Sequence, residues 1–131
     1  MKLITRETDY SIRALAFIAL QKGAVVSASQ LVDELKIPRP FLRGLMQTLQ
    51  REGFLTSTRG KGGGFLLKKE SRDIHIIDII NVFQGKFSLT ECFLSKDPCP
   101  NKPKCKFRKE ILAIEDFARK KFSTLTIASF L

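Results

Sequence analysis

The sequence predicts a mainly α-helical fold with one small β-hairpin. Apolar residues recur at helical spacing in several stretches, and a glycine-rich turn separates two short β-prone runs. The 131 residues, of which 44% are hydrophobic, suffice for one core but not for two large domains. We therefore expect one compact domain, or a small domain with an appended helix.

Two helices are expected in the N-terminal third. The first helix covers residues 8–22, where apolar side chains recur at the spacing of one helix face: Ile12, Leu15, Ala16, Ala19 and Leu20. A second, short helix starts at Ser27, because the Ser-x-x-Gln pattern from Ser27 to Gln30 can cap the exposed amides of a helix start. A tight turn at residues 36–38 follows this second helix directly.

A third helix is expected over residues 39–51, with Pro40 tolerated in its first turn. One face of this helix is apolar, and the other carries Arg39, Arg43, Gln47 and Gln50. Arginine suits the edge of guanine, and glutamine the edge of adenine, in a DNA major groove that is wide enough for a helix. Such residues on an exposed helix are usually just solvated, but the short helix at Ser27, the tight turn and this third helix together form a helix-turn-helix arrangement.

A β-hairpin is expected at residues 54–69, around the glycine-rich turn at residues 60–64. The alternative is a phosphate-binding loop, but the G-x-x-x-x-G-K-[ST] pattern is absent and the glycines precede a strand-like run instead of a helix. Arg59 and Lys61 lie at the tip of this hairpin. We interpret it as a wing that reaches into a groove of DNA or along its phosphates.

The C-terminal part is expected to contain an irregular loop and a long helix. A short apolar segment at residues 74–83 comes first, and three prolines then break residues 86–106. The amphipathic helix from about residue 104 to 123 carries more apolar surface than a small domain can easily hide. We interpret it as a dimerisation helix, with packing against its own domain as the alternative. The expected units are 1–85, a winged helix-turn-helix DNA-binding domain, 86–106, a three-cysteine loop, and 107–131, the dimerisation helix and tail.

The charge of the chain indicates a polyanionic partner. The net charge is +10, and the basic residues cluster: residues 36–69 contain eight basic residues and one acid. Double-stranded DNA is therefore the expected partner. The charged N-terminus lacks the apolar core of a signal peptide, so we expect a cytoplasmic protein that does not span a membrane. The sequence shows no pairing of a nucleophile with a base, and we do not expect an enzyme.

Cys92, Cys99 and Cys105 lie within fourteen consecutive residues, separated by six and then five residues. Three unrelated free thiols are one interpretation, while an odd number in a reducing cytosol disfavours a disulfide framework. A proline-bent loop can gather three thiolates around one metal centre. Zinc requires a fourth ligand, and no histidine or further cysteine lies nearby. An iron-sulfur cluster, 2Fe-2S or 4Fe-4S, tolerates an oxygen ligand or an open site more readily, so the cluster is favoured over zinc.

Taken together, these motifs resemble the IscR/NsrR family of bacterial winged-helix regulators, also called the Rrf-two regulators, over nearly the whole chain. The resemblance rests on Thr8-Asp9-Tyr10, on the stretches IPRPFLRGLMQTLQREGFL, STRGKGGGFLL and IIDIINVFQG, and on three cysteines before a long helix. Members of this family are homodimeric repressors or activators. They carry an iron-sulfur cluster in the three-cysteine loop and respond to nitric oxide, oxidants or cluster supply.

The resemblance implies roles for particular residues, and Cys92, Cys99 and Cys105 would be the thiolate ligands of the cluster. The chain departs from the IscR pattern at Arg108, where IscR-like proteins carry a histidine ligand, and its first cysteine gap is six residues instead of the commoner five. It is closer to the NsrR type, in which an aspartate from the opening helix of the partner subunit can be the fourth ligand; Asp9 occupies that place. The residues expected to contact DNA, from the reading face and the resemblance together, are Arg39, Phe41, Arg43, Gln47, Arg59, Lys61 and Gly62.

The expected function is a homodimeric, sequence-specific DNA-binding transcription regulator controlled by an iron-sulfur cluster and bound to an imperfect palindromic operator. Two alternatives remain. The first keeps the winged helix but replaces the cluster with a thiol redox site or a zinc site. The second is a structural protein that binds nucleic acid without sequence preference and with a steep dependence on salt.

Overall fold

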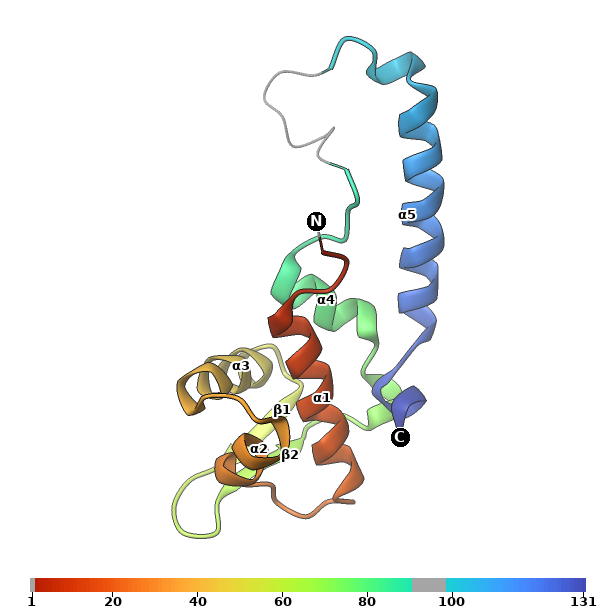
Figure 1. Ribbon diagram of the computed structural model, residues 1–131. Helices are drawn as coiled ribbons and strands as arrows, with labels where there is room; N and C mark the ends of the chain where they lie inside the picture. Colours follow the sequence, from red (N-terminus) through yellow and green to blue (C-terminus); the bar gives the residue numbers. More distant parts are fainter. Residues whose placement is uncertain (1, 91–98) are drawn as a thin grey trace.

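Five α-helices and one two-stranded antiparallel sheet are found in this computed structural model, which describes residues 2–90 and 99–131 (Figure 1). The predicted mainly α-helical fold with a small β-hairpin is confirmed. Three short 3-10 helices accompany these elements: Ser71–Asp73, Lys102–Lys104 and Ile127–Phe130. The main elements in chain order are α1 (Arg6–Leu20), α2 (Ala28–Leu35), α3 (Arg39–Arg51), β1 (Leu55–Thr58), β2 (Gly64–Leu67), α4 (Ile76–Gln84) and α5 (Lys106–Thr124).

Side-chain caps fix the starts of α1 and α2. The hydroxyl of Thr5 accepts a hydrogen bond from the Thr8 N–H at 3.4 Å, so α1 begins two residues before the expected position. The Ser27 N–H donates to Gln30 Oε1 at 2.8 Å, and the Gln30 N–H donates to Ser27 Oγ at 3.1 Å. This reciprocal pair confirms the predicted capping box.

α3 has the predicted bounds and separates an apolar face from a polar one. Its apolar residues face the core that α1, α2 and β1 enclose. The opposite face is exposed at all four polar positions, 39, 43, 47 and 50. Burial of one face therefore fixes which side chains α3 presents outward. The buried residues of α3 are Leu42, Leu45, Met46 and Leu49.

The hairpin is attached to the helices through an additional bridge. β1 and β2 pair in register from Leu55 opposite Leu67 to Thr58 opposite Gly64. Beside them, the Val26 N–H donates to the Phe65 carbonyl at 3.0 Å, and the Phe65 N–H donates to the Val26 carbonyl at 2.8 Å. This bridge ties the wing to the segment that precedes α2.

The start of α5 lies away from the body, and the helix runs back toward the body, which the chain rejoins after the end of α5 (Figure 1). Ile127, in the 3-10 helix that follows α5, is fully buried, and its N–H donates to the Ile74 carbonyl at 3.0 Å. The Ile76 N–H donates to the Leu125 carbonyl at 2.9 Å. The C-terminal tail thus shares the core of the winged-helix part, although the sequence placed it in a unit with α5.

Candidate DNA-reading groove and cysteine segment

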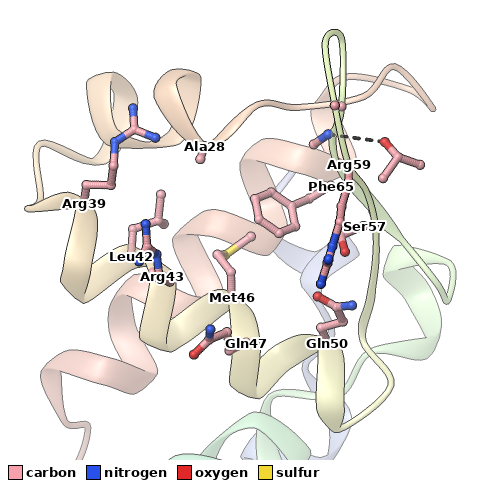
Figure 2. A pocket seen from close by; sticks show the side chains of 14 residues that line it. Ala28, Arg39, Leu42, Arg43, Met46, Gln47, Gln50, Ser57, Arg59 and Phe65 are labelled. Carbon is pink, nitrogen blue, oxygen red and sulfur yellow. Dashed lines mark hydrogen bonds between the residues drawn. The ribbon is translucent and has the colours of Figure 1, made fainter.

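The exposed face of α3 and the hairpin border one open groove of about 400 Å³. Figure 2 shows Arg43 and Gln47 along the outer side of α3, with Arg59 on the hairpin across from Gln50. Guanidinium and amide groups from two separate elements therefore face the same space. The sequence-predicted residues that line this groove are Arg39, Arg43, Gln47, Gln50 and Arg59.

Arg39 lines the groove and also makes a hydrogen bond within the chain. Its guanidinium donates to Ser29 Oγ at 2.8 Å, which joins the start of α3 to α2. Arg43 and Gln47, one and two turns further along α3, are exposed. The groove also contains two hydroxyl residues of β1, Ser57 and Thr58, which were not among the predicted contacts. The sequence signal for them is the run at residues 55–58, in which one apolar residue precedes three hydroxyl residues; only the apolar residue is buried.

The wing glycines allow close approaches of the backbone. A Cβ atom on Gly63 would lie 2.3 Å from the Thr58 carbonyl oxygen, and one on Gly64 would lie 2.2 Å from the Val26 carbonyl oxygen. Both glycines are thus required by packing within the hairpin and against the bridge to Val26. Lys61 and Gly62 lie at the exposed tip, beyond the residues that line the groove.

Phe41 lies apart from the groove. Its ring is partly buried and makes an edge-to-face contact with Tyr10 of α1, at 5.9 Å between ring centroids. The guanidinium carbon of Arg6 lies 4.7 Å from the centroid of the same ring. The resemblance grouped Phe41 with the major-groove residues, but position 41 falls between the polar and apolar faces of α3, and its ring packs toward α1.

The cysteine segment is described in part. Cys99 is exposed and Cys105 is half-buried, and both are free thiols; Cys92 lies outside the described residues. Cys105 immediately precedes α5, and its sulfur accepts a hydrogen bond from the Arg108 N–H at 3.3 Å. Within residues 2–90 and 99–131, no three His, Cys, Asp or Glu side chains come together as a metal site. One thiol, that of Cys105, is nevertheless placed at the start of the long helix.

A buried glutamate of α5, Glu115, binds the start of the cysteine loop, and no sequence pattern had predicted this contact. Glu115 accepts hydrogen bonds from the Leu89 N–H at 2.9 Å and from Arg119 at 2.5 Å, and Arg119 also donates to the Phe87 carbonyl. The hydrogen bond from Leu89 lowers the pKa of Glu115, burial opposes that shift, and Arg119 reinforces it. Residues 87–89 are thereby fixed to α5.

Asp9 lies in the first turn of α1, where Thr5 supplies the cap. One carboxylate oxygen of Asp9 lies 2.9 Å from Nε of Arg13; the Arg13 side chain is exposed and that of Asp9 is partly exposed. Figure 1 places α1 in the body and the segment from Cys99 to Cys105 at the far end of α5. A single chain therefore does not bring Asp9 to these cysteines.

Comparison with known proteins identifies the family. The family described as "Iron-dependent Transcriptional regulator", Rrf2, matches residues 4–131. The chain belongs to the Rrf2 family. A protein of Aquifex aeolicus named as an HTH-type transcriptional regulator is 38% identical over 90 residues, which are 69% of this chain and 62% of that protein. The HTH-type transcriptional regulator NsrR of Bacillus subtilis is 33% identical over 107 residues, 80% of this chain and 73% of the relative.

Solved structures of regulators share the fold. CymR, the global cysteine regulator of B. subtilis, superposes with a TM-score of 0.81 at 24% identity, over 99% of this chain and 96% of CymR. IscR of T. potens superposes with a TM-score of 0.69 at 26% identity, over 99% of this chain and 85% of IscR. The predicted resemblance to the IscR/NsrR family is confirmed, and this Rrf2 protein is a transcription regulator. None of its described helices is both long and apolar enough to cross a membrane.

Proposed function

We propose that this Rrf2 protein is a homodimeric, sequence-specific DNA-binding regulator, and that its DNA affinity depends on an iron-sulfur cluster. The observation that carries the DNA-binding part is the groove between α3 and the wing. Arg43 and Gln47 are exposed on α3, and Arg59 faces them from the hairpin. An α-helix fits the major groove, where arginine and glutamine donate to base edges, while a wing reaches the adjacent minor groove or backbone.

The dimer is supported by the apolar surface of α5. The stripe on this helix is divided: Ala118 and Phe122 pack against the chain's own core, whereas Phe107, Ile114 and Phe117 are 74%, 56% and 74% exposed. These three residues share one side of the helix. A second α5 would cover them, which gives a two-fold dimer and an imperfect palindrome with half-sites about one helical turn, or a multiple of it, apart. A monomeric mass at micromolar concentration, with or without DNA, would contradict this part.

The cluster would be held by Cys92, Cys99 and Cys105, with Asp9 of the partner subunit as the fourth ligand. Thiolate sulfur is the usual protein ligand of iron-sulfur clusters, so the donor set fits, and Cys105 is already oriented by the first turn of α5. When bound, the cluster supplies a centre that changes with redox state or nitric oxide. Asp9 can leave Arg13 at low cost, because exposed ion pairs contribute about 0–1 kcal/mol.

Anaerobic purification followed by absorption spectroscopy and iron and sulfide analysis tests the cluster, and DNA binding before and after nitric oxide tests its control. Asp9→Ala is expected to change the cluster spectrum or its reactivity while the fold and the dimer survive. Glu7→Ala is the matched control, because Glu7 is the other acid in the first turn of α1 and is exposed. An identical spectrum in the Asp9 variant returns Asp9 to its pair with Arg13, and a colourless wild-type protein that still switches excludes the cluster.

The second candidate function is a thiol switch on the same winged helix. Cys99 and Cys105 are free thiols on one short segment, and Cys99 is exposed, so an oxidant can reach it. Oxidation would then change DNA affinity without iron. Peptide mass spectrometry of oxidised protein distinguishes the two, because a thiol switch leaves a disulfide or sulfenic acid on Cys99 or Cys105 in metal-free protein.

A further inference from the structure

Two arginines of α1 flank the ring of Tyr10, and they differ in their partners. Arg13 lies 5.8 Å from the ring centroid and forms its ion pair with Asp9. Arg6 lies 5.6 Å from the Tyr10 centroid and 4.7 Å from that of Phe41. Among the residues that the structure describes, no carboxylate forms an ion pair with Arg6. One guanidinium is thus neutralised locally, while the other keeps its charge and is held by two aromatic rings.

The position of Arg6 follows from that of Phe41. Phe41 lies in the first turn of α3, two residues from both Arg39 and Arg43. Its ring packs against Tyr10 and beneath Arg6, so the exposed guanidinium of Arg6 is held beside the N-terminal end of the reading helix. A helix-turn-helix protein presents this end of its recognition helix to the bases. Side chains around it meet the sugar-phosphate backbone that borders the groove.

We propose that Arg6 is a DNA-phosphate contact and that Phe41 is the residue that positions it. This inference rests on the proposed DNA-binding function. A guanidinium that stacks on an aromatic face keeps its N–H groups free in its own plane, where they can donate to two phosphate oxygens. Because the rings already restrict the Arg6 side chain, less conformational freedom is lost when it binds phosphate. The same arrangement gives the ring of Phe41 a function outside the groove.

The test measures binding of the full-length protein to two duplexes of equal length, over a series of KCl concentrations. One duplex is selected from a random pool by the wild-type protein, and the other is its scrambled sequence. Arg6→Ala is expected to weaken binding to both duplexes about equally, by about 5- to 10-fold, and to reduce the slope of log K against log salt by about 2, because each dimer loses two phosphate contacts. Arg6→Lys should keep the slope and lose part of the affinity, because lysine is a point charge without the planar fork.

Two further variants isolate the cause. Phe41→Leu should weaken binding by about 2- to 3-fold at unchanged salt slope, because the charge remains but is no longer held in place. Lys120→Ala on α5 removes the same unit of charge from an exposed residue already paired with Asp116, and should bind as the wild type does. Circular dichroism and thermal melts of each variant verify that the fold persists.

The outcomes separate this inference from the proposed function. Wild-type affinity and salt slope in Arg6→Ala overturn the phosphate contact, while preference of the wild-type protein for the selected duplex keeps the DNA-reading function intact. A loss confined to the selected duplex also overturns the inference, because it makes Arg6 a base contact. If the wild-type protein does not distinguish the duplexes, the proposed sequence-specific function itself fails.

Discussion

The α3–wing groove and the cysteine end of α5 differ in what completes them. Arg43 and Gln47 are held outward because the opposite face of α3 is buried in the chain's own core. At the start of α5, Cys105 is half-buried, and Phe107 is exposed two residues later. The proposed reading surface is therefore complete within one chain, whereas the cysteine end of α5 has apolar area that one chain does not cover. In the proposed dimer, the DNA-reading side chains would be positioned by each chain alone, whereas the cysteine end of α5 would be completed by the second subunit.

The largest expected effect tests whether the body that supports the groove includes the C-terminal tail. Ile127→Ala removes a fully buried side chain beside Ile74 and should lower the free energy of unfolding by about 2–5 kcal/mol. Phe130→Ala, in the same 3-10 helix but 53% exposed, should change it by less than about 0.5 kcal/mol. Urea denaturation measures both. A change of less than about 0.5 kcal/mol for Ile127→Ala as well would show that the tail is not part of the core.

A charge on the uncovered face of α5 tests the other half of the comparison. Phe117→Asp places a carboxylate on a residue that is 74% exposed in the single chain, so the monomer should fold normally. In a dimer that buries this face, the dissociation constant should rise at least about 30-fold, as for a central interface residue. Sedimentation equilibrium measures it. Lys109→Ala makes the same change in net charge at another exposed position, and a similar loss in that variant would mean that charge, not burial, is responsible.

Arg43→Ala tests whether the groove reads bases. The expected loss of specific affinity is about 1–3 kcal/mol, with a relaxed preference at one base position, as for a base-edge contact. Binding assays against a panel of single-base variants of the selected site measure it. If affinity falls equally on every sequence, Arg43 contacts phosphate, and the reading function shifts to Gln47 and its neighbours.

The smallest expected effect concerns the link between the two regions. Glu115→Gln removes the negative charge of the carboxylate that accepts a hydrogen bond from the Leu89 N–H and pairs with Arg119. This change should lower the free energy of unfolding by about 1 kcal/mol at neutral pH. Because the pKa of Glu115 is lowered on folding, its contribution is present above the usual value of 4.5 and is lost as the pH falls through the folded pKa. The difference between the two proteins should therefore shrink below about pH 4.5. A constant difference from pH 7 to pH 3 would show that the charge is not responsible.

Much of the fold followed from local patterns. The Ser27–Gln30 capping box, the bounds of α3 and the hairpin were predictable because each depends on residues close in sequence. The row of Arg39, Arg43 and Gln47 was predictable for the same reason, since side chains four residues apart on a helix share a face. The family resemblance followed from these same short stretches.

Long-range packing was decided by the tertiary structure. The ring of Phe41 lies at the edge of the apolar face of α3, and Tyr10 and Arg6, more than thirty residues earlier, determine that it turns toward α1. Glu115 reads as one acid on an amphipathic helix until Leu89, 26 residues away, donates to it. Helical periodicity identified the apolar stripe of α5, but only the folded chain shows that Phe122 is covered and Phe117 is not, because coverage depends on which surfaces meet in three dimensions.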